Sequence, residues 1–208
     1  MSALEQDDTH RGAPFGSYPA TCSNVHAIRK NIPDELKQDS IWIPAPYAQP
    51  EVPHWQPPDK WMHFDDVRSA FPALVLPSKV LCIEVLDVLA DGMHVKPDGL
   101  DHVQTILDAG GATYVEVMED KKGVHILYHV GTVPAPWRHV VPHTSYRGMR
   151  MRLPFGGAYV GLGRVVVMTG FTRRPRPIST ARKGIFAALA RIGDGLDEMN
   201  LFTKEGTS

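Results

Sequence analysis

The chain has 208 residues, of which 43% are apolar and 22% are charged. This composition suits a globular domain and excludes a fully disordered or fibrous chain. No apolar run approaches the roughly 20 residues of a membrane-spanning helix, and the first residues lack the apolar core of a signal peptide. Two cysteines, Cys22 and Cys82, predict neither a disulfide framework nor a metal cluster. We therefore expect a cytoplasmic protein with no membrane partner.

The pattern of apolar and turn-forming residues predicts short strands interspersed with helices. Residues 1–30 are polar and aperiodic and predict a flexible N-terminal arm. The predicted elements that follow are a helix over 31–37, a strand over 41–43, a helix over 64–71, strands over 74–76 and 80–88, a helix over 99–108, a hairpin of 113–118 and 124–130, strands over 147–153, 158–160 and 164–168, and a helix from 178 to about 200. This order favours an α+β core domain over 31–176, with a mostly antiparallel sheet and helices packed on it, and a C-terminal helix and tail over 177–208.

Charge is segregated along the chain. Between Trp137 and Ile185 there are ten basic residues and no acidic residue, whereas residues 1–136 contain nineteen acidic and ten basic residues. Such a stretch predicts a polyanionic partner, either nucleic acid or nucleotide. The alternative is a basic face that balances an acidic face in the same domain or in a dimer. The residues expected to contact nucleic acid are Arg138, Arg147, Arg150, Arg152, Arg173, Arg174 and Arg176.

Glu84 lies inside the apolar strand Cys82-Ile83-Glu84-Val85, and Asp87 follows near its end. A buried carboxylate is costly unless it meets a metal ion or a cation. The pair Glu84 and Asp87 could hold one divalent ion. Side chains three apart on a regular strand point to opposite faces, so a shared ion needs a bulge or the end of the strand. The alternative is a Glu paired with an Arg and an Asp at a strand end.

His125 alternates with Val124 and Ile126 on the second strand of the predicted hairpin. If the two aliphatic residues face the core, His125 lies on the opposite, functional face. The alternative is an exposed hairpin histidine. The sequence contains neither the phosphate loop of NTPase motors nor the nucleophile elbow of α/β-hydrolases. Among the four tryptophans we expect base stacking only from Trp137, which begins the basic stretch.

Several short sequence motifs follow one another in an order that is typical of one protein family. They are the proline-led Ile32 to Leu36, the Trp-containing Ile41 to Ile43, Lys60 to Phe64, the acidic strand Ile83 to Asp87, Gly123 with His125, Gly148 to Met151, and Arg164 with Thr169-Gly170. This order resembles the N-terminal domain of bifunctional DNA primase–polymerases, the prim-pol proteins of phages, plasmids and bacterial mobile elements. The resemblance spans about residues 31–171.

The resemblance implies a prim-pol fold, related in shape to RRM-type sheets, and a role in DNA replication. In that family two metal ions held by three carboxylates activate a 3′-hydroxyl and neutralise the triphosphate. It implies that Glu84 and Asp87 hold Mg²⁺ or Mn²⁺, that His125 is catalytic, and that His125 and Arg164 contact the nucleoside triphosphate. The basic stretch from Arg138 to Arg176 would then follow the template strand.

Four departures from the family pattern concern its functional residues. Glu84 replaces the first Asp, and the second is Leu86 in register or Asp87 one residue later. The third acid is Arg150, and Glu119 to Lys121 replace the Ser and first Gly of the histidine motif. A cation at the third position should repel a metal ion, so the fold can persist while nucleotidyl transfer is lost or altered.

Three functions therefore stay open. The first is a small primase–polymerase, a nucleotidyltransferase that extends primers on single-stranded DNA. The second is a catalytically inactive prim-pol-like protein that binds nucleic acid and recruits or inhibits replication proteins, such as a replicative helicase. In the third, the resemblance is accidental and the basic stretch serves protein assembly.

Overall fold

The structure is a computed structural model that describes residues 27–39, 41–45, 59, 61–90, 96–132, 148–153, 156–161 and 165–192. Three α-helices are described, α1 (Asp34–Lys37), α2 (Pro97–Gly110) and α3 (Ile185–Ile192). The described strands are β1 (Trp42–Pro44), β2 (Pro72–Val75), β3 (Val80–Val85), β4 (Tyr114–Val117), β5 (Val124–His129), β6 (Gly148–Leu153), β7 (Gly156–Gly161), β8 (Val165–Val167) and β9 (Ser179–Thr180). This content confirms the expected α+β class with mostly antiparallel pairing.

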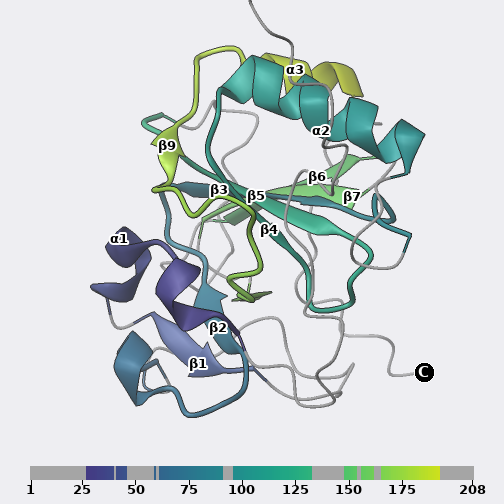
Figure 1. Cartoon of the computed structure of the whole chain (residues 1–208). Helices are drawn as coiled ribbons and strands as arrows, with labels where there is room; N and C mark the ends of the chain where they lie inside the picture. The colour runs from purple at the N-terminus through teal and green to yellow at the C-terminus, as the bar shows by residue number, and fades with distance from the viewer. Residues whose placement is uncertain are drawn as a thin grey trace, which may run out of the picture.

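The strands form two sheets rather than the one sheet that the sequence predicts. The larger has the order β4-β5-β3-β7-β6, all antiparallel, and β9 pairs in parallel with β5. The smaller has the order β1-β2-β8. Figure 1 shows α2 and α3 on one side of the larger sheet and β1 and β2 on the other. The larger sheet is therefore the middle layer.

Because β3 is the central strand of the larger sheet, its side chains are buried on both faces, as the run of apolar and β-branched residues in 80–88 predicts. On the helix face Ile83 belongs to a core cluster with Val103 of α2 and Leu189 of α3. On the opposite face Cys82 belongs to a second cluster with Trp42 of the smaller sheet. Alternate residues of β3 thus pack against different layers, which fixes the register of the strand.

Helix α2 starts and stops at residues with special backbone properties. Pro97 occupies its first turn, where a fixed φ and a missing N–H suit a helix start, so the helix begins two residues before the predicted range of 99–108. Gly111 ends the helix with φ of 93°, and its N–H donates to the Leu107 carbonyl at 2.7 Å. The pair Gly110-Gly111 just after the predicted helix is typical of a helix stop, and the structure confirms this stop.

Two helix predictions are wrong in extent. Instead of a helix over 64–71, the chain makes a single 3-10 turn at Phe64–Asp66 and enters β2 at Pro72. Proline disfavours helical geometry in the residue before it. The predicted helix from 178 to about 200 is described over Ile185–Ile192, and residues 193–200 lie outside the described residues. Its first residues form β9 instead, and the Ala181 N–H donates to the His129 carbonyl at 2.8 Å.

The end of the predicted N-terminal arm packs on the fold. The Ala27 N–H donates to the Ala70 carbonyl at 2.9 Å, and the Ile28 N–H donates to the Thr169 carbonyl at 2.8 Å. Residues 1–26 lie outside the described residues. None of the described helices is long and apolar enough to cross a membrane.

Candidate functional site

Three polar residues stand in one line across the larger sheet. Glu84 of β3 and Glu116 of β4 are both register partners of His125 on β5. Direct partners in antiparallel strands project to the same face. Val124 and Ile126 lie in the core cluster on the helix face, so the predicted face of His125 is confirmed. We call Glu116, His125 and Glu84 the carboxylate–histidine row.

The row is buried, and its charges face one another. The Nδ1 atom of His125 lies 3.2 Å from Oε1 of Glu116, and its Nε2 atom lies 4.0 Å from Oε1 of Glu84. The exposed fraction is 2% for His125, 0% for Glu116 and 6% for Glu84. The imidazole therefore lies between two carboxylates rather than in the exposed position that the alternative interpretation gave it.

The pKa of His125 is raised despite its burial. Burial alone lowers the pKa of an imidazole because it disfavours the charged form. The hydrogen bond to Glu116 and the charges of Glu116 and Glu84 act in the opposite direction and prevail. A protonated His125 is thus a cation that compensates two buried carboxylates.

Glu116 is held in place by donors from its own strand and from the segment at 169–170. Its carboxylate accepts from the Tyr114 hydroxyl at 2.7 Å, from the Thr169 N–H at 3.2 Å and from the Gly170 N–H at 2.8 Å. Burial, then the charge of Glu116, raises the pKa of Tyr114 well above its ordinary value, so the hydroxyl keeps its proton. Thr169 and Gly170, which are part of the prim-pol resemblance, therefore fix the Glu116 carboxylate through their N–H groups. We call this pair the clamp on Glu116.

Gly170 permits this clamp because of its backbone geometry. Its φ is +66°, in the left-handed region that favours glycine. A Cβ atom at this position would lie 2.2 Å from the Ile28 carbonyl oxygen. No other residue type fits here without moving the chain next to Ile28.

Sequence reasoning missed Glu116, although the signal was present. Glu116 lies between Val115 and Val117 in a predicted strand, just as Glu84 lies between Ile83 and Val85. The argument that singled out Glu84, a carboxylate inside an apolar strand, applies equally to Glu116. Their common partner His125 could not be inferred without knowing which strands are neighbours.

Asp87 has surroundings unlike those of Glu84. It follows β3 with φ of +56°, its side chain is exposed, and its Oδ1 atom lies 4.0 Å from Nζ of Lys96. The structure thus places Glu84 beside His125 and Asp87 beside Lys96. Within the described residues no group of three Asp, Glu, His or Cys side chains is arranged to hold a metal ion. The Mg²⁺ or Mn²⁺ site stays a prediction.

The predicted arginines fall into three groups. Arg138, Arg147 and Arg164 lie outside the described residues. Arg150 and Arg152 lie on the edge strand β6, where Arg152 is the register partner of Gly157, itself the partner of Glu84. The register of the larger sheet thus runs from Glu116 on the edge strand β4 through the carboxylate–histidine row to Arg152 on the opposite edge strand β6.

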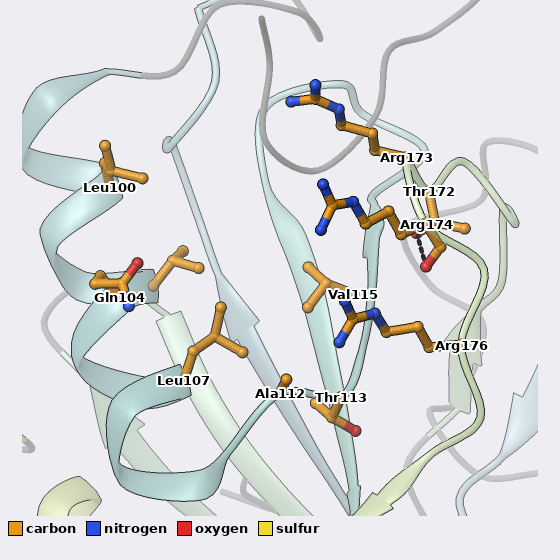
Figure 2. Close-up of a pocket in the computed structure, with 11 residues that line it drawn as sticks. Leu100, Gln104, Leu107, Ala112, Thr113, Val115, Thr172, Arg173, Arg174 and Arg176 are labelled. Carbon is orange, nitrogen blue, oxygen red and sulfur yellow. Dashed lines mark hydrogen bonds between the residues drawn. The ribbon is translucent and has the colours of Figure 1, made fainter. Parts of the chain in front are cut away.

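The third group consists of Arg173, Arg174 and Arg176, which are exposed and line one groove. This arginine groove has a volume of about 360 Å³. It lies between α2, the edge strand β4 and the segment 172–176. Figure 2 shows the Arg174 and Arg176 side chains reaching from that segment toward α2. The lining residues are Leu100, Val103, Gln104, Leu107, Ala112, Thr113, Val115, Thr172 and the three arginines.

Comparison with known proteins does not assign the chain to a family. No protein-family model matches the chain, and no curated protein matches it.

Proposed function

We propose that this chain is a prim-pol-like replication protein that binds single-stranded nucleic acid and does not transfer nucleotides. The observation that carries the absence of catalysis is the carboxylate–histidine row, in which the carboxylates of Glu116 and Glu84 both face one buried imidazole. The exposed arginines of the segment 172–176 support the binding of a polyanion.

The surroundings of the row favour a binding protein over an enzyme. Two-metal nucleotidyl transfer needs several carboxylate oxygens that are open to metal ions and to a triphosphate. Here the oxygens of Glu116 accept protein donors, and the carboxylate is fully buried. Arg150 stands where the resembled family has its third acid. These features fit a fold that keeps its architecture with altered chemistry.

An active primase–polymerase is the second candidate. It is favoured by Glu84 and His125, two residues with predicted catalytic roles, which are register partners on one face of the sheet. In such an enzyme Glu84 would bind metal and His125 would contact the triphosphate, which requires Glu84 to turn away from the imidazole.

One experiment separates the two candidates. Incorporation of labelled nucleotides on a primed single-stranded template with Mn²⁺ is measured for the wild type, for Glu84→Gln and for the exposed control Asp66→Asn. In parallel, Mn²⁺ with a nucleoside triphosphate is titrated into each protein by calorimetry. We expect template binding by all three proteins without incorporation. Incorporation that is lost in Glu84→Gln and kept in Asp66→Asn would establish the enzyme instead. A wild type that binds no single-stranded nucleic acid would overturn the proposal.

A further inference from the structure

The arginine groove and the carboxylate–histidine row lie on opposite faces of strand β4. Val115 lines the groove and Glu116 belongs to the row, and neighbouring residues of a strand point to opposite faces. Val115 also packs against the core cluster of the helix face. A ligand in the groove is therefore separated from Glu84 and His125 by the sheet itself, so the groove is a site of its own.

The groove combines an aliphatic wall with a cationic wall. The α2 side is formed by Leu100, Val103 and Leu107, and Leu100 is 40% exposed. The opposite side carries Arg174 and Arg176 (Figure 2). Within the described part of the chain neither of these two arginines forms an ion pair with a carboxylate. Such a groove matches a ligand with an apolar body and an anionic group.

The other polar side chains of the groove already have protein partners. The Thr113 hydroxyl donates to the Leu127 carbonyl and accepts from the Ser179 N–H. The Thr172 hydroxyl donates to the Arg174 carbonyl at 3.3 Å. The Gln104 amide donates to Asp108 at 2.7 Å and keeps its oxygen as an acceptor. The anion of a ligand is therefore left to the guanidinium groups.

We propose that the arginine groove binds one nucleotide unit of a single-stranded nucleic acid. This inference rests on the binding function proposed above and assigns the site of that binding. The base lies against Leu100, Leu107 and Val115 and stacks on a guanidinium plane, and the phosphates contact Arg174 and Arg176. Arginine planes accept unstacked bases and also bind phosphate. A volume of about 360 Å³ is within the range of small-ligand sites.

Charge beyond the groove favours a strand over an isolated anion. The groove arginines belong to the 49 residues from 137 to 185 that contain ten basic residues and no acidic residue. A small lipid or a free nucleotide would use only the groove. A polyanionic strand can also contact cations on either side of it, and each contact adds counterion release.

The test measures the anisotropy of a labelled oligothymidylate against protein concentration at several salt concentrations. The groove variant is Arg174→Ala with Arg176→Ala, and the matched control is Arg68→Ala with Arg191→Ala, which removes the same charge from exposed positions outside residues 137–185. We expect the groove variant to weaken binding by about 10- to 100-fold. We expect it to reduce the slope of log K against log salt by about 1.4, since each phosphate contact on a single strand contributes about 0.7. The control should change binding less than about threefold.

A second pair of variants tests the aliphatic wall. Leu100→Glu places an acid in the groove at an exposed helix position, and Ala187→Glu adds the same charge at an exposed position of α3. We expect about a tenfold loss of affinity from Leu100→Glu and less than a threefold loss from Ala187→Glu. Because both positions are exposed, neither change is expected to unfold the protein.

The outcomes distinguish this inference from the proposed function. If the wild type binds the oligomer and both groove variants bind equally well, the groove assignment is wrong while nucleic-acid binding stands. Competition by thymidine monophosphate as effective as by the oligomer, at equal nucleotide concentration, would make the groove a site for free nucleotide and overturn the strand. A wild type that does not bind the oligomer would overturn both proposals.

Discussion

The carboxylate–histidine row and the arginine groove are both charged, but they differ in where the compensating charge comes from. In the row, His125 lies between Glu116 and Glu84, and all three are buried. In the groove, Arg174 and Arg176 are exposed and face an aliphatic wall. Removing one partner of a buried compensated pair destabilises the fold, because the other charge is left buried without a counter-charge, whereas a charge left to solvent is available to a partner. The row should therefore govern stability and the groove should govern binding.

The largest effect on stability is expected from removing the central carboxylate of the row. Glu116→Ala leaves the Tyr114 hydroxyl and the Thr169 and Gly170 N–H groups without their acceptor in a buried region. Breaking one partner of a buried ionic network costs about 3–5 kcal/mol of unfolding free energy. Urea unfolding followed by circular dichroism measures it.

The control for Glu116→Ala is Asp101→Ala, which removes an exposed carboxylate from α2. Its expected change is within about 0.5 kcal/mol. A loss below 1 kcal/mol for Glu116→Ala would mean that the row does not hold the fold together, and the contrast between the two regions would fail.

The next effect is expected at the glycine of the clamp. Gly170→Ala forces a Cβ atom into the left-handed region and toward the Ile28 carbonyl oxygen. A strained residue of this kind costs about 1–3 kcal/mol. Gly184→Ala is the control, because a Cβ atom there has no neighbour within 4 Å. Thermal unfolding of both variants measures the difference, and equal melting temperatures would contradict a role for this turn in holding Glu116.

The pH dependence of the unfolding free energy tests whether His125 carries a positive charge in the row. The folded protein raises the pKa of His125 above the unfolded value of about 6.5. The protonated imidazole therefore contributes stability fully below that value and loses it as the pH rises through the folded pKa. We expect the difference in unfolding free energy between the wild type and His125→Gln to be largest near pH 6 and to shrink toward pH 9. A difference that stays constant over this range would show that folding does not raise the pKa of His125.

The smallest effect on stability is expected in the groove. The double variant Arg174→Ala with Arg176→Ala removes exposed side chains that form no ion pair among the described residues. Its unfolding free energy should stay within about 0.5 kcal/mol of the wild type, even though its binding of a strand is expected to fall. Chemical unfolding checks this, and a loss above 2 kcal/mol would place the arginines in the architecture of the fold.

Local patterns were sufficient for many features of the fold. The alternation around His125 predicted its face, and the apolar run at β3 predicted burial on both sides. What could not be predicted depends on distant partners. The line from Glu116 through His125 to Glu84 exists only because β4, β5 and β3 are neighbours in the sheet. The arginine groove likewise needs α2 beside segment 172–176, about 70 residues later in the chain.

The clamp on Glu116 also has a consequence for folding kinetics. Strands β4 and β5 are joined by a short turn and can pair early, whereas the Gly170 N–H that holds Glu116 lies 54 residues away in sequence. Contacts that close such long loops are slow to form and are expected after the rate-limiting step. Glu116→Gln should therefore accelerate unfolding while leaving the refolding rate nearly unchanged. Stopped-flow measurements of refolding and unfolding rates test this. The expected result would mean that the clamp forms after the rate-limiting step and sets the lifetime of the folded protein.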